Sequence, residues 1–152
     1  MIVDDIDINV LQQLMTHGRI TWSELASLLQ LSAPATADRV RRLEEKGIIQ
    51  SYAALVNPEL IGCGITAFIA VTLDRPEHRQ GFVDLVNQLP EIQECHHVTG
   101  DDDYLLKVRC TSTRSLEALI SNQIKGLPGI LRTRTTLALS TVKETPVLPL
   151  PI

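Results

Sequence analysis

Residues 21–50 constrain the fold of this 152-residue chain more than any other segment. A helical pattern of apolar residues follows Thr21, and Glu24 stands three residues further on, which is the spacing of a capping box. The turn over residues 30–32 ends at Ser32, a suitable N-cap for a second helix. The apolar spacing upstream predicts a supporting helix over about residues 5–16. Together these features are the outline of a helix-turn-helix, which would place the second helix in a DNA major groove.

The second helix of this motif divides into an apolar and a polar side. At about 100° per residue, the side expected to be buried carries Ala33, Thr36, Ala37, Val40 and Leu43. We expect Arg39 and Arg42 to contact base edges, where each arginine–guanine pair would contribute roughly 1–3 kcal/mol of discrimination. Arg41 and Lys46 would contact phosphates. The complete set of candidate DNA-contacting residues is Ser32, Ala35, Asp38, Arg39, Arg41, Arg42 and Lys46.

An alternative interpretation of the polar side is an ordinary solvated helix face. Asp38 with Arg42, and Arg41 with Glu45, have the i, i+4 spacing of surface ion pairs. Charge alone supports both interpretations equally. The capped helix and the short turn that precede the arginines favour DNA binding.

Composition sets limits on the class of protein. With 44% hydrophobic residues the chain has enough apolar side chains for compact domains. Its net charge is −4, so DNA binding would depend on the local arginine cluster, doubled by dimerisation. The three cysteines lack metal-ligand spacing and are interpreted as small buried residues in a reducing cytosol. The acidic start MIVDDID and the lack of a membrane-length apolar run predict a cytoplasmic protein with no membrane partner.

The rest of the chain alternates between strand and helix periods. A strand over residues 48–56 and a hinge over 57–64 would follow the first domain, residues 1–56. The second domain, residues 65–152, reads as βαββαβ, with strands at 65–73, 92–98, 104–110 and 131–139 and helical stripes at 82–89 and 116–124. We therefore predict an α+β protein, a winged-helix-like helix-turn-helix domain followed by a ferredoxin-like domain.

One face of the predicted sheet requires cover. Both helices of a βαββαβ unit lie on the same face, and the other face would carry Phe68, Leu105 and Ala138. These side chains are too apolar to face water alone. A second copy of the chain is the simplest cover, and a homodimer would also pair two DNA-reading helices.

Two segments, DRVRRLEEKGIIQSYAALVNP and EIQECHHVTGDDDYLLKV, resemble the Lrp/AsnC (feast/famine) family of transcriptional regulators, nearest its leucine-responsive branch. The resemblance covers essentially the whole chain. It implies a helix-turn-helix domain, a hinge strand, and a second domain that binds an amino-acid effector between subunits and assembles dimers into octamers or other rings. The implied effector-binding residues are Gly100, Asp101, Asp102, Asp103, Tyr104, Thr133 and Thr135.

Two positions depart from the family's pattern. Pro34 stands where relatives often have Ser or Thr, which removes a phosphate donor. Asp102 stands where many relatives have an aromatic or other large residue, so the acidic loop, residues 99–103, contains three adjacent carboxylates. This concentration of acids would alter effector choice or favour a cationic ligand.

The acidic loop and the two adjacent histidines raise two alternatives, metal binding and enzymatic function. Consecutive acids in a tight connection point in different directions, and His96 and His97 would project to opposite faces of a strand, so we expect no metal site and no cofactor. The loop suits an amino acid, because glycine-loop N–H groups can hold a carboxylate and an Asp can hold an ammonium. Competing functions are a haem-pathway decarboxylase-like enzyme using His96 or His97, and a ligand-binding co-regulator with weak DNA binding. We predict a regulator without catalytic residues.

Overall fold

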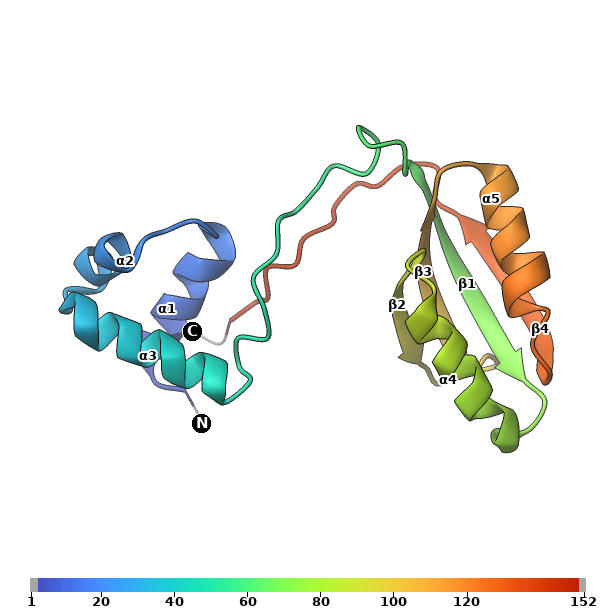
Figure 1. Ribbon diagram of the computed structural model, residues 1–152, viewed down its shortest axis with the longest axis horizontal. Helices are drawn as coiled ribbons and strands as arrows, with labels where there is room; N and C mark the ends of the chain where they lie inside the picture. The colour runs from blue at the N-terminus through green and yellow to red at the C-terminus, as the bar shows by residue number, and fades with distance from the viewer. Residues whose placement is uncertain (1–2, 151–152) are drawn as a thin grey trace. The chain divides into compact units, whose positions relative to one another are not determined.

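The computed structural model describes residues 3–150 of the chain. The terminal positions 1–2 and 151–152, which the domain limits drawn from the sequence include, lie outside the described residues. The chain forms two compact units, residues 3–56 with 143–150 and residues 57–142 (Figure 1). The segment from Lys143 onward groups with the first unit, whereas the sequence assigned it to the second domain. Among the described residues, no helix has the length and apolar character needed to cross a membrane.

The first unit contains three helices, each started by a side-chain cap: α1 (Asp5–Thr16), α2 (Trp22–Leu29) and α3 (Ala33–Glu45). The predicted capping box at Thr21 is confirmed, because its hydroxyl accepts from the Glu24 N–H and Glu24 accepts from the Thr21 N–H. Ser32 caps α3, accepting from the Ala35 N–H at 3.3 Å. The turn between α2 and α3 is closed by Gln30 in the left-handed conformation, with φ 55°.

The predicted strand over residues 48–56 is wrong. Ile48 and Ile49 donate their N–H groups to the Leu43 carbonyl at 2.9 and 3.1 Å, and so end α3 by wrapping around its last turn. Both isoleucines pack on the core of the first unit. Residues 51–56 are exposed, and within the described chain they form no ladder. The apolar residues at the start of this segment therefore belong to the end of α3 and not to a strand. A turn begins at Asn57, the first residue of the predicted hinge: its side chain accepts from the Glu59 and Leu60 N–H groups.

The second unit is the predicted βαββαβ fold. Its sheet has the order β2-β3-β1-β4 with every neighbouring pair antiparallel, which is the ferredoxin-like arrangement. The strands are β1 (Ile65–Leu73), β2 (Ile92–His97), β3 (Tyr104–Cys110) and β4 (Ile130–Leu137). Between them lie a 3₁₀ turn (Pro76–His78), α4 (Arg79–Gln88), and α5 (Thr113–Ala118), which continues into a π-helical turn (Leu119–Ile124).

Both helices cover the same face of the sheet. The core between these helices and the sheet contains Phe82 of α4 and Leu116 of α5 with alternate residues of β1 and β3. The opposite face, called here the open face, carries Thr66, Phe68, Ala70, Thr72, Leu105, Lys107, Arg109, Arg132 and Arg134. Phe68 and Leu105 are 38% and 37% exposed, so the apolar patch expected on this face is uncovered in the single chain.

Candidate nucleic-acid interface and acidic loop

Helix α3 has one buried and one exposed side, as the helical rotation predicted. Thr36, Val40 and Leu43 are buried, whereas Ala33, assigned to the buried side by the sequence, is exposed at the helix start. The exposed candidates for DNA contact are Ser32, Ala35, Asp38, Arg41, Arg42 and Lys46. These residues form one polar surface on the helix that a helix-turn-helix inserts into the major groove.

The exposed arginines of α3 differ in their partners. Arg41 pairs with Asp38 at 2.5 Å and with Glu45 at 3.8 Å, so Asp38 is bound to Arg41 and not to the expected Arg42. Because these side chains are 64–67% exposed, the pairs contribute little stability and can exchange for phosphates. Arg42 is exposed and forms no ion pair with any of the described residues. It is the guanidinium of α3 most available to a ligand.

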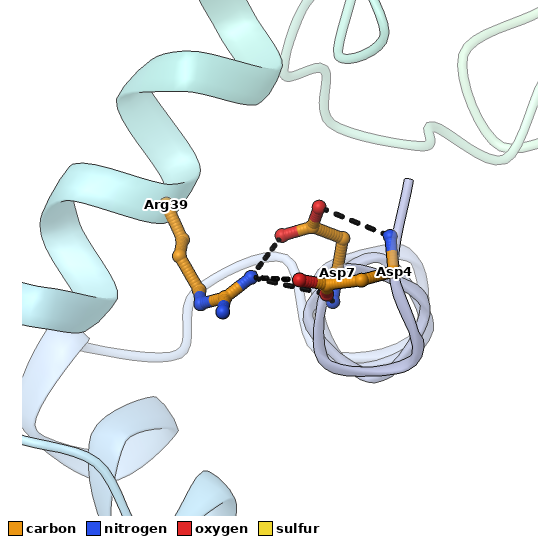
Figure 2. A network of polar contacts seen from close by, with 3 residues as sticks. All are labelled: Asp4, Asp7 and Arg39. Carbon is orange, nitrogen blue, oxygen red and sulfur yellow. Dashed lines mark hydrogen bonds and ion pairs between the residues drawn. The ribbon is translucent and has the colours of Figure 1, made fainter. Parts of the chain in front are cut away.

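Arg39 lies differently from the position that the sequence predicted for it. Its Nη1 donates to Asp4 at 2.8 and 3.0 Å and to Asp7 at 2.8 Å, so the side chain is directed at the start of α1 (Figure 2). It is only 20% exposed, compared with 64% for Arg41. We call these three residues the Arg39 network. A guanidinium held by two carboxylates is not free to read a base edge, which favours a supporting role for Arg39.

We expect the Arg39 network to make the stability of the first unit depend on pH in acid. The hydrogen bond from Arg39 holds the pKa of the Asp4 carboxyl below its ordinary value of 3.8. A carboxyl with a lowered pKa stabilises the fold above its unfolded pKa and loses that contribution as pH falls toward the folded value. We expect Arg39→Ala to reduce the loss of stability below pH 3.8. Fluorescence of Trp22, the single tryptophan, followed during thermal unfolding at several pH values, would measure this. Parallel pH profiles in both proteins would contradict it.

The acidic loop is held in place by its own backbone and by Asp103. Gly100 has φ 112°, a conformation that favours glycine. The Val98 N–H donates to the Asp103 carbonyl at 2.9 Å, and the Asp103 N–H donates to the Val71 carbonyl at 3.0 Å. The Asp103 carboxylate accepts from the Leu73 N–H at 2.7 Å. The backbone and carboxylate of Asp103 therefore attach the loop to the end of β1.

Asp102 is also engaged within the chain. Its carboxylate accepts from the Thr72 hydroxyl at 3.0 Å and forms ion pairs with Arg132 at 3.3 Å and Arg134 at 2.5 Å. Burial raises the pKa of Asp102, but Thr72 and the two arginines outweigh it and leave that pKa below the ordinary value. Of the three adjacent acids, only Asp101 is exposed. The structure therefore does not support a triple-acid cation site, because two of the carboxylates already have partners.

The remaining predicted effector residues lie near the loop on the helix-covered face. Tyr104 is 5% exposed and packs on Phe82 and His97, each with ring centroids 4.9 Å apart. Val71 is paired with both Tyr104 and Thr133, so these residues form one row across the sheet. Thr135 lies in the next row, opposite Ile69. The structure brings Tyr104 and Thr133 close to the loop.

The sequence analysis missed three partners of the loop: Thr72, Arg132 and Arg134. The alternation Arg-Thr-Arg at residues 132–134 was a usable signal, since two cations on one face of a strand require nearby acids. Across the described residues, no group of three His, Cys, Asp or Glu side chains is arranged to hold a metal ion. Cys110 is buried, and Cys63 and Cys95 are half-buried free thiols. Burial raises the pKa of Cys95.

Both units match families of domains found in known proteins. Residues 3–50 match the family model for a winged helix-turn-helix DNA-binding domain, and residues 66–148 match that for the Lrp/AsnC ligand binding domain. The leucine-responsive regulatory protein of Escherichia coli strain K12 is 41% identical over 144 residues, covering 93% of this chain and 88% of that protein. Solved structures of two regulators are also similar. One, from Neisseria meningitidis in complex with L-methionine, has TM-score 0.92 and 32% identity, covering 97% and 96% of the two chains.

The second solved structure is a feast or famine regulatory protein from M. tuberculosis complexed with L-methionine, with TM-score 0.86 and 38% identity, covering 93% of this chain and 95% of that one. A helix-turn-helix unit followed by a ligand-binding unit defines a DNA-binding transcriptional regulator. The chain belongs to the Lrp/AsnC family. The resemblance stated from the sequence is thereby confirmed. The relatives of this chain are regulators and not enzymes, so the decarboxylase alternative is not favoured.

Proposed function

We propose that α3 reads operator DNA, with Arg42 contacting a base edge and Arg41 and Lys46 contacting phosphates. The observation that supports this most strongly is Arg42, which is exposed, has no ion pair within the described part of the chain, and lies on a helix whose opposite side is buried. Asp38 and the helix start, with Ser32 and Ala35, complete the contact surface. Arg39 supports this surface from the side of α1. A reader of chromosomal DNA of this kind acts in the cytoplasm.

We further propose that the open face is covered by a second copy of the chain. Phe68, Ala70 and Leu105 form an apolar centre flanked by charged side chains at both sheet edges. A self-complementary patch with an apolar centre is typical of an isologous dimer interface. The dimer would present two copies of α3 to half-sites about one helical turn, or a multiple, apart. Assembly of dimers into an octamer is the state expected from the family.

The effector proposed for the second unit is an amino acid. Support comes from two similar regulators whose structures contain L-methionine and from a relative named for its response to leucine. In this chain, N–H groups around Gly100 would hold the carboxylate, and the exposed Asp101 would hold the ammonium. Tyr104, Thr133 and Thr135 would complete the site, between copies of the chain. Binding would shift the equilibrium between assemblies that differ in effector affinity.

The test of this function is binding of the purified protein to the DNA upstream of its own gene. Scrambled DNA of equal length is the control, and each measurement is repeated at several salt concentrations with and without each amino acid. We expect specific binding with a steep salt dependence that one or a few amino acids change. Binding equal to that of scrambled DNA, in every condition, would contradict the proposal for this operator and lead to a search for distant sites by in vitro selection.

Asp102→Asn should weaken the effector response. Loss of the charge releases Arg132 and Arg134 and leaves the acidic loop attached through Asp103 alone, so we expect effector affinity to fall by about tenfold, the value of one charge-assisted hydrogen bond. Calorimetric titration with the amino acid that alters DNA binding measures this.

Asp101→Asn removes the same charge from the same loop without touching the two arginines. We expect it to weaken effector binding while leaving the dimer unchanged, whereas Asp102→Asn leaves two unpaired cations on the open face and weakens the dimer as well. Unaltered effector affinity in Asp102→Asn would show that the contacts of Asp102 do not organise the site.

A further inference from the structure

The Arg39 network joins two helices that are far apart in the sequence. A single nitrogen, Nη1 of Arg39, donates to both oxygens of Asp4 and to Oδ1 of Asp7. The two acids are already ordered by the capping box of α1, in which the Asp7 N–H donates to Asp4 at 2.8 Å and the Asp4 N–H donates to Asp7 at 3.3 Å. The first turn of α1 therefore presents two oriented carboxylates to one side chain of α3 (Figure 2).

Burial distinguishes the Arg39–Asp7 pair of this network from the surface pairs of α3. The side chains of Asp7 and Arg39 are 13% and 20% exposed, whereas those of Asp38 and Arg41 are 67% and 64% exposed. Asp4, at 55% exposed, lies at the solvent side of the network. Ion pairs removed from water are screened less by salt than exposed pairs. The Arg39–Asp7 pair will therefore persist at salt concentrations that weaken contacts to phosphates.

The apolar core of the first unit determines which side of α3 is buried, and the Arg39 network adds directional contacts that hold this rotation more narrowly. That core consists of Val10, Leu25, Val40 and Leu43. Hydrophobic contact is not directional, whereas charge-assisted hydrogen bonds are. Arg39 lies next to Val40 and three residues before Arg42, so anchoring Arg39 sets the direction in which Arg42 projects.

We propose that Asp4, Asp7 and Arg39 are positioning residues for DNA recognition: the two acids hold Arg39 away from the DNA and set the rotation of α3. The inference rests on the proposed role of α3 as the DNA-reading helix. Positioning by the two acids and simple charge repulsion predict opposite effects on DNA affinity when an acid is removed. An acid near a DNA-binding surface repels phosphates, so its removal should strengthen binding to any sequence. If the acid positions α3, its removal weakens binding to the specific sequence.

Asp7→Asn and Asp5→Asn form a matched pair for this test. Each removes one negative charge from the first turn of α1, but only Asp7 contacts Arg39, and Asp5 is exposed. The full chain is measured on a duplex obtained by in vitro selection with the wild-type protein and on a scrambled duplex. We expect Asp7→Asn to bind the selected duplex roughly tenfold more weakly than Asp5→Asn does. Both variants should bind the scrambled duplex alike, at least as tightly as wild type.

Variants of Arg39 separate positioning from a direct phosphate contact. Arg39→Lys keeps the charge and one donor nitrogen and should retain most of the specificity, whereas Arg39→Gln should lose it. Loss of a phosphate contact lowers the slope of log affinity against log salt by about one, so we expect an unchanged slope in Arg39→Gln. Trp22 fluorescence and the thermal midpoint confirm that each variant is folded at the assay temperature.

The outcomes that would overturn the inference differ from those that would overturn the proposed function. If Asp7→Asn strengthens binding to both duplexes as Asp5→Asn does, or if Arg39→Gln lowers the salt slope by about one, Arg39 is a DNA contact and the acids do not position α3. If the wild-type protein itself enriches no sequence, the role of α3 in reading DNA fails, and the positioning inference fails with it.

Discussion

Arg42→Ala should reduce affinity for the operator by about tenfold to a hundredfold per binding helix, with a much smaller effect on scrambled DNA. Arg42 is exposed on the surface of α3 and forms no ion pair with any of the described residues. A bidentate arginine–guanine pair contributes roughly 1–3 kcal/mol of discrimination, which corresponds to this range. In a dimer both helices lose the contact, so the effect on the complete operator is larger. Binding to operators with single-base changes would locate the base that Arg42 reads.

Arg41→Ala is the matched control for this prediction. Arg41 is the neighbouring guanidinium, equally part of the exposed surface, but it is bound to Asp38 and Glu45. We expect its removal to weaken binding to specific and scrambled DNA alike and to reduce the salt slope by about one, as for a phosphate contact. If Arg41→Ala relaxed base preference while Arg42→Ala did not, the two roles proposed here would be reversed.

Phe68→Glu should separate the dimer. Phe68 lies at the centre of the open face, diagonal to Leu105 and opposite Lys107 and Thr136 in the sheet register. An interface that covers this patch would have to bury the new carboxylate, so we expect the dimer dissociation constant to rise by roughly a hundredfold or more. Sedimentation velocity over a range of protein concentrations measures the change. Operator affinity should fall in parallel, because a single helix-turn-helix contacts only one half-site.

A comparable change elsewhere tests whether the open face is responsible. Leu60 is 84% exposed in the turn before β1, outside the sheet, and Leu60→Glu makes the same kind of substitution. We expect Leu60→Glu to remain a dimer. If Phe68→Glu sediments as the wild type does and keeps a near-native thermal midpoint, the chain associates through another surface.

Local chemistry made much of the fold predictable. The Thr21 and Ser32 caps were read correctly because a cap is a contact between residues three apart, which the sequence contains in full. β1 and β3 were predicted with the bounds the structure gives, because an alternating apolar pattern follows directly from one buried face. The strand over 48–56 failed because Ile48 and Ile49 are apolar for a different reason: they cover the end of α3.

The candidate site was harder to predict than the fold, because it depends on contacts between residues that are distant in the sequence. The helical rotation of α3 taken alone puts Arg39 beside Arg42 on the polar side. Nothing in residues 33–45 indicates that Arg39 forms ion pairs with Asp4 and Asp7. The acidic loop was found as a motif of three adjacent acids, but the sequence alone did not indicate which of the carboxylates is free. The structure leaves only Asp101 exposed, because Asp102 meets two arginines of β4 and Asp103 meets the end of β1.

The sequence by itself determined the caps of α2 and α3, the order of strands and helices in the second unit, the acidic loop and the family, since each is encoded by residues near one another in the chain. Only the tertiary structure decided which charges are free to meet a ligand. A charge can be neutralised by a partner 30 or more residues away, as Arg39 is by Asp4 and Asp102 is by Arg132. The availability of a side chain for binding is therefore a property of the packed molecule, because it depends on which partners folding brings within hydrogen-bonding distance.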